Sequence, residues 1–328
     1  MTSPPLLSVR HLTTEFHLVD KRIVRALDDV SFDVMPGQTV GLVGESGCGK
    51  TTVLMSIMRL LPSNGRITAG NVHFQGKDLL TLSEREMRDR RWKDMAIVFQ
   101  GAMNALNPVM KVGDQIREAI LLHKLMDSDA AEKRVEELLE LVGIPYLRRD
   151  QYPHQYSGGM RQRAMIAMAL GCSPALLFAD EPTTALDVMI QAQVLDLLKD
   201  IQKRLGLTIV LVTHDLGVVA EICDSVVVMY GGKVAESGSA DSVYNQPQHP
   251  YTQRLLAAFP DLNKPSDALA FISGTPPRLT DLPMGCRFHP RCDLKIAPCN
   301  EVTPPMIETS HAHYAACHFC QGKEAVFS

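Results

Sequence analysis

The sequence lacks long apolar runs and any excess of positive charge. No apolar stretch reaches the roughly 18 to 20 residues that a membrane-spanning helix needs, so we expect membrane association only through a partner. Lys and Arg number 33 against 37 Asp and Glu, a net charge of -4, and a broad nucleic-acid-binding face is therefore not expected. No signal peptide is evident at the start, so the eight cysteines do not predict a disulfide framework.

The composition that remains is that of a soluble globular protein. The chain has 328 residues, of which 45 % are hydrophobic and 21 % charged. A length of about 150 residues per domain predicts roughly two domains. Five of the eight cysteines stand at or beyond residue 286, so the end of the chain differs in chemistry from the rest.

One glycine-rich stretch has the spacing of a phosphate-binding loop. An apolar strand is predicted at residues 39–43, and apolar residues at helical spacing follow the stretch as far as Leu61. Glycines let the backbone N–H groups turn inward toward phosphate oxygens, at the start of a helix whose dipole also attracts anions. Lys50 would add a positive charge, and Thr51 would place a hydroxyl on Mg²⁺. An ordinary glycine-rich turn is the alternative. The stretch comprises Gly44, Glu45, Ser46, Gly47, Cys48, Gly49, Lys50 and Thr51.

The residues before this loop predict a small antiparallel sheet. Residues 7–10 and 30–34 alternate apolar and polar side chains, as half-exposed strands do. Phe16 lies between them and could stack on a nucleotide base. A phenylalanine in the core is the other interpretation.

A long insertion separates the loop from the next candidate residues. It is predicted to be largely helical, with amphipathic helices at 112–123, 129–141 and 158–170. A buried strand at 95–99 precedes these helices and ends in Gln100. That glutamine could reach a metal or a water, or it could be a solvated loop residue.

Three further polar groups follow predicted turns and strands. Ser157, Gly158 and Gly159 open a helix and could bind an anion, although Ser157 could simply cap its own helix. Asp180 and Glu181 end an apolar strand, where one carboxylate could hold Mg²⁺ through water and the other could activate an attacking water. After a helix at 188–204 and a strand at 208–212, His214 could touch a γ-phosphate or be structural.

Together these motifs, in this order, resemble the ATP-binding-cassette (ABC) ATPases. The resemblance covers about residues 6 to 320 and implies an α/β P-loop NTPase fold with an antiparallel β subdomain and an inserted helical subdomain at about 101–172. Tyr156, where the family usually has leucine, and Cys48 are the departures. The matching motifs are the Walker A loop at 44–51, Gln100 of the Q-loop, the signature at 157–159, the Walker B strand at 176–180, the D-loop at Ala185, Leu186 and Asp187, and the switch histidine His214.

The family resemblance implies roles for these residues. Glu181 would activate water, assisted by Gln100 and His214. Thr51, Gln100 and Asp180 would hold Mg²⁺. Ser157, Gly158 and Gly159 of a facing protomer would close over ATP, so that ATP joins a head-to-tail dimer whose opening follows hydrolysis. The ATP-binding set would comprise Phe16, Gly44, Glu45, Ser46, Gly47, Cys48, Gly49, Lys50, Thr51 and Thr52.

The end of the chain predicts a second domain. After a nucleotide-binding domain at 1–245, residues 246–328 include Pro265, Pro276, Pro277 and Pro283 as a linker-like path. Four thiolates at this spacing could ligate zinc or an iron–sulfur cluster, and fortuitous cysteines are the alternative. Because these cysteines are far in sequence from the nucleotide residues, we expect a structural or docking role. They are Cys286, Cys292, Cys299 and Cys317, with Cys320 as a fifth.

This tail resembles that of the ATPase subunits of dipeptide, oligopeptide and nickel importers. The resemblance implies a [4Fe–4S] cluster on the four cysteines, with Zn²⁺ as the alternative and Cys320 outside the set. It also implies a second, different ATPase chain, two permeases, an extracytoplasmic binding protein and a place on the cytoplasmic face of the inner membrane. We therefore expect ATP-driven import of di- or oligopeptides. Alternatives are nickel or metal-chelate import and, with less support, a soluble ABC ATPase of DNA repair or translation.

Overall fold

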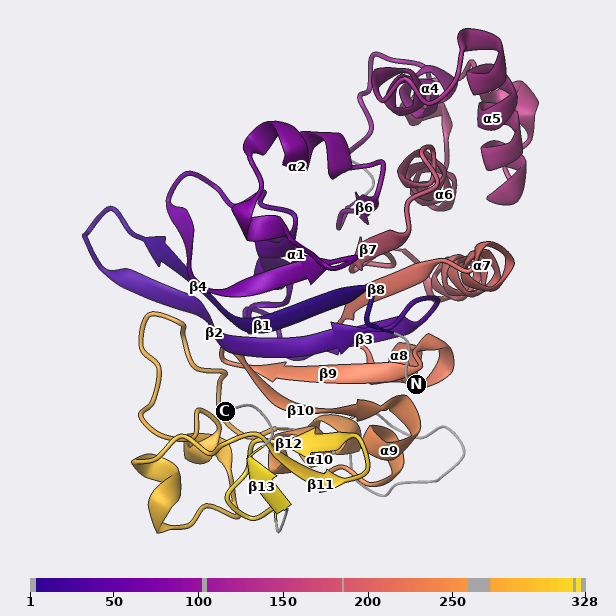
Figure 1. Ribbon diagram of the computed structural model, residues 1–328. Coiled ribbons are helices and arrows are strands. Elements are labelled where there is room, and N and C mark those ends of the chain that lie inside the picture. Colours follow the sequence, from indigo (N-terminus) through magenta and orange to yellow (C-terminus); the bar gives the residue numbers. More distant parts are fainter. Residues whose placement is uncertain (1–3, 102–104, 185, 259–271, 321–322, 326–328) are drawn as a thin grey trace. The chain divides into compact units, whose positions relative to one another are not determined.

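The computed structural model describes residues 4–101, 105–184, 186–258, 272–320 and 323–325. The chain separates into two compact units. The β-rich unit combines Met1–Met35, Thr39–Leu80 and Thr213–Ser328, and the helix-rich unit combines Pro36–Gln38 with Thr81–Val212. Strands and helices occur in both units (Figure 1), which agrees with the predicted α/β class.

The β-rich unit contains the predicted antiparallel sheet, in the order β2-β1-β4-β5. Its two long strands extend beyond the predicted 7–10 and 30–34. The simple alternation breaks because His11 (φ 51°) and Asp29 (φ 62°) adopt left-handed conformations, where the register between β1 and β2 shifts. The strands are β1 (Leu7–His17), β2 (Ile23–Val34), β4 (Gly65–Phe74) and β5 (Lys77–Asp78).

A second run of strands in the β-rich unit joins the end of the chain to the phosphate-loop strand, in the order β13-β11-β12-β10-β9-β3. Strand β3 pairs with β9 in parallel, whereas β12 pairs with β10 antiparallel, with Glu236 opposite Ala315. The tail strands lie next to β10 in Figure 1. The strands are β3 (Thr39–Val43), β9 (Ser225–Tyr230), β10 (Lys233–Ser239), β11 (Ile307–Ser310), β12 (His313–Ala315) and β13 (Lys323–Ala325).

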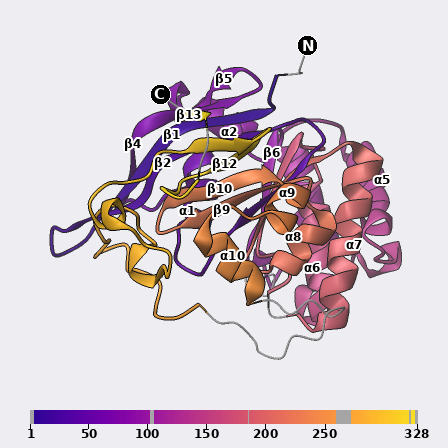
Figure 2. The same ribbon diagram turned by 90° about the horizontal axis from the view of Figure 1, so that it is seen from below.

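Four α-helices accompany these strands in the described residues of the β-rich unit. Helices α9 and α10 lie over one face of β9 and β10 (Figure 2). The helices are α1 (Lys50–Ile57), α8 (Leu216–Ile222), α9 (Ala240–Asn245) and α10 (Pro250–Ala257).

The helical spacing predicted through Leu61 is wrong, because α1 ends at Ile57. Arg59 takes a left-handed conformation (φ 52°). The N–H of Leu60 then donates to the carbonyl of Met55 at 2.8 Å. This is the hydrogen-bond pattern of a helix end, and it turns the chain away before Leu61.

The helix-rich unit contains parallel strands in the order β8-β7-β6 and the predicted helical insertion. The helices expected at 112–123, 129–141 and 158–170 are confirmed with ends within one residue. Within the described ranges, no helix combines the length and hydrophobicity that a bilayer crossing requires. The elements are β6 (Met95–Val98), β7 (Leu176–Asp180), β8 (Thr208–Thr213), α2 (Glu84–Arg90), α4 (Val112–Leu122), α5 (Ser128–Leu141), α6 (Gly158–Ala169) and α7 (Val188–Leu205).

Candidate nucleotide-binding site

The phosphate loop (residues 44–51) connects the buried strand β3 to α1, as its sequence predicts. Gly49 is the N-cap of α1 in a left-handed conformation (φ 109°) without a side-chain cap. A Cβ there would lie 2.9 Å from the carbonyl oxygen of Ala26, and a Cβ at Gly44 would collide with the carbonyl of Met229. Only glycine fits both positions. The first turn of α1 therefore presents backbone N–H groups that can donate hydrogen bonds to an anion.

Lys50 lies against its own loop. Its side chain is buried, and Nζ donates to the carbonyl oxygens of Gly44 at 2.7 Å and Glu45 at 3.1 Å. Burial raises the pKa of the neighbouring Cys48 thiol, against the opposing charge of Lys50. Cys48 is thus a packed, protonated side chain that supports the loop from beneath.

His214 follows β8 and is exposed. The next residue, Asp215, caps α8 by accepting from the N–H of Gly217 at 2.8 Å. Phe16 on β1 is half-buried, and its ring lies over Gly65 of β4, where a Cβ would be 2.9 Å from Cε1. A γ-phosphate contact by His214 and base stacking by Phe16 both stay predictions.

In the helix-rich unit, β6 and β7 bring Gln100 and Glu181 together. Nε2 of Gln100 donates to Oε2 of Glu181 at 2.7 Å, and the hydroxyl of Thr184 donates to the same oxygen at 3.0 Å. Glu181 has a left-handed backbone (φ 44°), which its N–H stabilises by donating to Val212 at 2.9 Å. The preceding Asp180 is 3 % exposed at the end of β7. The two adjacent carboxylates therefore stand in different environments.

Ser157 begins α6, and its hydroxyl accepts from the N–H of Met160 at 3.2 Å. The N-cap interpretation of Ser157 is thus confirmed. A Cβ on Gly159 would lie 2.7 Å from Ile190 of α7, so glycine allows close helix packing there. Tyr156, the departure from the family's leucine, is buried and donates to the carbonyl of Arg148 at 3.0 Å. Its burial raises its pKa to about 12.

The predicted D-loop is described only at some of its residues. Ala185 lies outside the described residues. Asp187 is the N-cap of α7 and accepts from the N–H of Ile190 at 3.0 Å. A further role for Asp187 stays a prediction.

The tail cysteines gather in one region but not at metal-binding distance. The N–H of Cys286 donates to the carbonyl of Cys299 at 2.8 Å. Burial is the main cause that raises the pKa of Cys286 to about 11, and Cys299, Cys317 and Cys292 contribute to the same rise. Among the described residues, no three potential ligands lie close enough to hold one metal ion. Pro265 of the predicted linker lies outside the described residues.

The fifth cysteine also contacts this region. Sγ of Cys320 lies 3.9 Å from the carbonyl oxygen of Gln248. Its thiol donates a hydrogen bond to Cys317, which lowers the pKa of Cys317. Cys320 therefore favours the thiolate form of Cys317.

Comparison with known proteins assigns the family. The family model for the ABC transporter matches residues 27–184, and that for the oligopeptide/dipeptide transporter C-terminal region matches residues 235–299. The dipeptide transport ATP-binding protein DppD of Bacillus subtilis is 50 % identical over 315 residues, covering 95 % of this chain and 94 % of that protein. The chain belongs to the ABC transporter ATPases. As a member of that family it binds ATP and is an ATPase.

Two further relatives agree with this ABC ATPase assignment. The oligopeptide transport ATP-binding protein OppD of Bacillus subtilis is 48 % identical over 313 residues, covering 94 % of this chain and 87 % of that protein. Among solved structures, the dimeric ATP-binding cassette MJ0796 in a post-hydrolysis state with ADP and Pi has a TM-score of 0.64 and 27 % identity, over 71 % of this chain and 98 % of that one.

Sequence reasoning missed three residues that contact the candidate ABC residues within each unit. Thr184 could have been found, because its hydroxyl follows Glu181 at a three-residue spacing. Tyr251 was noted only within the segment that resembles the importers, yet its hydroxyl accepts from the N–H of Glu45 at 2.9 Å. Arg291 is 246 positions from Glu45, which its guanidinium binds. No local pattern marks that pairing.

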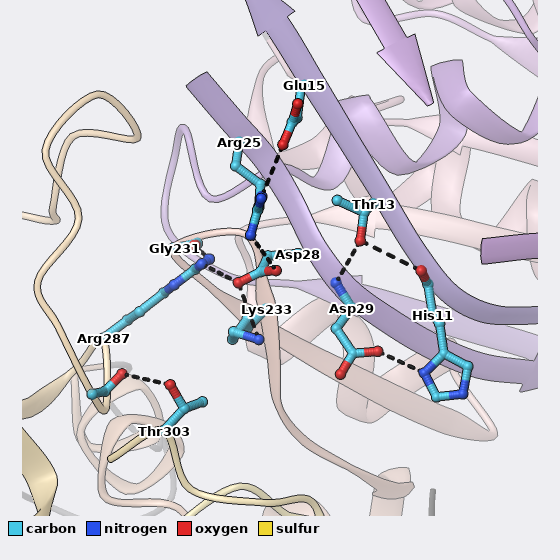
Figure 3. A network of polar contacts seen from close by, with 11 residues as sticks. His11, Thr13, Glu15, Arg25, Asp28, Asp29, Gly231, Lys233, Arg287 and Thr303 are labelled. Carbon is cyan, nitrogen blue, oxygen red and sulfur yellow. Dashed lines mark hydrogen bonds and ion pairs between the residues drawn. The ribbon is translucent and has the colours of Figure 1, made fainter. Parts of the chain in front are cut away.

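The tail is also anchored to the N-terminal strands. Figure 3 shows Arg287 reaching Asp28 and the carbonyl of Gly231, while Nζ of Lys233 lies 3.1 Å from the same Asp28 carboxylate. Burial alone would raise the pKa of Asp28, but Lys233 and Arg287 hold it below its usual value. Asp28 is therefore a charged anchor between β2, β10 and residues 272–320, here called the cysteine segment.

Proposed function

We propose that the protein is the ATP-hydrolysing subunit of an importer of di- or oligopeptides. The observation that carries this proposal is the similarity to DppD and OppD over almost the whole chain, tail included. The corresponding functional domains are residues 1–245, with a helical subdomain at 101–172, and residues 246–328. Nickel or metal-chelate import is the second candidate, because the same type of tail is expected there.

Within the ATP site, each residue has a proposed task. Lys50 and the backbone of residues 44–52 bind the phosphates, and His214 contacts the γ-phosphate. Glu181 takes a proton from the attacking water, and the hydrogen bonds from Gln100 and Thr184 orient its carboxylate for that task. Ser157, Gly158 and Gly159 of a second protomer complete the site.

The proposed Mg²⁺ ligands are Thr51, Gln100 and Asp180, whose side chains carry the oxygen atoms that Mg²⁺ prefers. The amide nitrogen of Gln100 donates to Glu181, so its amide oxygen is the atom that would serve a cation. Bound Mg²⁺ would neutralise the charge that develops on the phosphates. The protein's own residues then position ATP and water around it.

For the tail, we propose a [4Fe–4S] cluster on Cys286, Cys292, Cys299 and Cys317, with a single zinc ion as the alternative. Four thiolates on one zinc would lie about 3.8 Å apart, given a zinc–sulfur distance of about 2.3 Å and tetrahedral geometry. A cluster binds each thiolate to a different iron, so its ligands surround a larger group. The proposal is supported by four cysteines that lie within 32 residues of the sequence, and Cys320 stays outside the proposed ligand set.

The proposed assembly is a peripheral one. A second ATPase, most simply a different chain, pairs with this protein beneath two permeases on the cytoplasmic face of the membrane. An extracytoplasmic binding protein delivers the solute. No nucleic acid is involved.

Reconstitution tests the proposal. The protein is co-purified with its permeases and partner ATPase, placed in proteoliposomes with the binding protein, and assayed for ATP-dependent uptake of a labelled dipeptide and of a nickel chelate. We expect ATP-dependent peptide uptake by the parent complex and none by the Glu181→Gln complex. ATP-driven nickel uptake without peptide uptake would replace the first candidate by the second.

A further inference from the structure

Glu45, the second residue of the phosphate loop, is held at three points. Its N–H donates to the hydroxyl of Tyr251 at 2.9 Å, and its carbonyl accepts from Lys50 at 3.1 Å. Its carboxylate accepts from both terminal nitrogens of Arg291, at 2.6 and 3.0 Å. Two of these three contacts come from beyond residue 245, so the end of the chain helps to shape the loop.

Arg291 uses every N–H group of its guanidinium in hydrogen bonds at this position. Its side chain is 5 % exposed. Besides Glu45, Nη1 donates to the Tyr230 hydroxyl at 3.2 Å, Nη2 to the carbonyl of Ile272 at 3.3 Å and Nε to that of Ser273 at 3.0 Å. A guanidinium has five N–H groups, and these five bonds account for all of them. The fork is therefore fixed in one orientation.

The positive charge of Arg291 compensates the negative charge of Glu45, which lies in the phosphate loop. A carboxylate in a loop that receives phosphates repels them unless a cation compensates it. Glu45 is 22 % exposed, so solvent screens its charge only to a limited extent. An arginine side chain stays protonated in proteins, and its two terminal nitrogens both donate to the Glu45 carboxylate. The pair is therefore neutral overall.

We propose that Arg291 is a positioning residue for ATP binding: it neutralises Glu45 and fixes the phosphate loop, so that the cysteine segment completes the nucleotide site. The inference rests on the proposed assignment of residues 44–51 as the phosphate loop. Arg291 ends the short turn His289–Arg291 and immediately precedes Cys292. The fold of the cysteine segment thus sets the position of a charge that the nucleotide site uses, although the cysteines are far from that site in sequence.

The test compares full-length variants by equilibrium binding of a fluorescent ATP analogue. Arg291→Gln should raise its Kd about tenfold, or about 1.4 kcal/mol, because the Glu45 charge is left uncompensated. Arg278→Gln makes the same charge change at an exposed residue of the same segment and should leave Kd unchanged. The double variant Glu45→Gln with Arg291→Gln should recover to within about threefold of the parent, since no charge is left unpaired.

A structural role alone predicts a different pattern. If the double variant binds as weakly as Arg291→Gln, or if Arg291→Gln binds as tightly as Arg278→Gln, the inference is overturned. Should Arg291→Gln not fold, Arg291→Lys decides, because lysine keeps the positive charge but cannot hold both carboxylate oxygens of Glu45. Its Kd should rise about two- to fivefold, and a Kd equal to that of Arg278→Gln would overturn the inference. Lys50→Ala tests the phosphate-loop assignment separately from the role of Arg291. Normal ATP binding by that variant would overturn the loop assignment itself.

Discussion

The amide nitrogen of Gln100 donates a 2.7 Å hydrogen bond to the carboxylate of Glu181. The two residues are 81 positions apart and follow neighbouring parallel strands. Thr184 donates to the same carboxylate oxygen, and a left-handed backbone at Glu181 directs the side chain toward both donors. A carboxylate held in this way has one orientation, which is what a proton-accepting group needs.

Replacing Glu181 by Gln should preserve ATP binding and stop hydrolysis. The amide keeps the size of the side chain and loses the basic oxygen, and ATP should then trap the closed dimer. Nucleotide affinity, phosphate release and size-exclusion chromatography with ATP measure these effects. Lys50→Ala is the contrasting variant, because it should weaken binding itself. Hydrolysis by Glu181→Gln at near the parental rate would show that another group activates the water.

Replacing Thr184 by Val should lower kcat roughly three- to tenfold and leave the Kd for ATP unchanged. The variant removes one hydrogen bond to Glu181, and such a bond contributes about 0.5–1.5 kcal/mol. Thr183→Val changes the adjacent residue and is the matched control. Equal losses in the two variants would mean that Thr184 supports the turn and not the carboxylate.

Cys292→Ser should abolish metal binding, whereas Cys320→Ser should keep it. Under the four-thiolate proposal, anaerobically purified protein is brown and carries about four irons and four sulfides per chain. Iron, acid-labile sulfide and zinc are measured in the parent and both variants. Stoichiometric zinc without sulfide, when iron is supplied, would exclude the cluster.

Acidification should destabilise the β-rich unit through His249. Burial lowers the pKa of this histidine to about 4, against the raising effect of Glu236. The unfolded chain, with a histidine pKa of about 6.5, binds more protons between these values, so stability is present above pH 6.5 and is lost as pH falls toward 4. The expected loss between pH 7 and pH 5 is about 2 kcal/mol for this group.

Denaturant unfolding of the full chain at the two pH values tests this expectation. His249→Asn keeps a polar acceptor at the N-cap of α10 and should show a flatter pH dependence. His311→Asn changes an exposed histidine in the same unit and should behave like the parent. Parallel behaviour of all three proteins would assign the acid sensitivity to other groups.

The sequence predicted local elements well because the responsible signals are local. Glycines around Lys50, the apolar run of β3 and the Ser157 cap of α6 each act within a few residues. The end of α1 was missed because the left-handed turn at Arg59 has no glycine to indicate it. The bonds of Glu45 to Tyr251 and Arg291 could not be predicted, since alternation and periodicity report which face is buried and not what covers it. Roles that need ATP or a second protomer stay predictions, because they depend on contacts with molecules other than this chain.

The divided course of the β-rich unit has a consequence for synthesis on the ribosome. Asp28 and Arg287 are 259 positions apart, and Glu45 and Arg291 are 246 positions apart. Residues 81–212 of the helix-rich unit are continuous and can fold while the rest is still being translated. The β-rich unit, whose first strands emerge earliest, can be finished only when the last third of the chain is released. A premature stop shortly before residue 286 would therefore leave the nucleotide site immature, although every residue of the phosphate loop had been made.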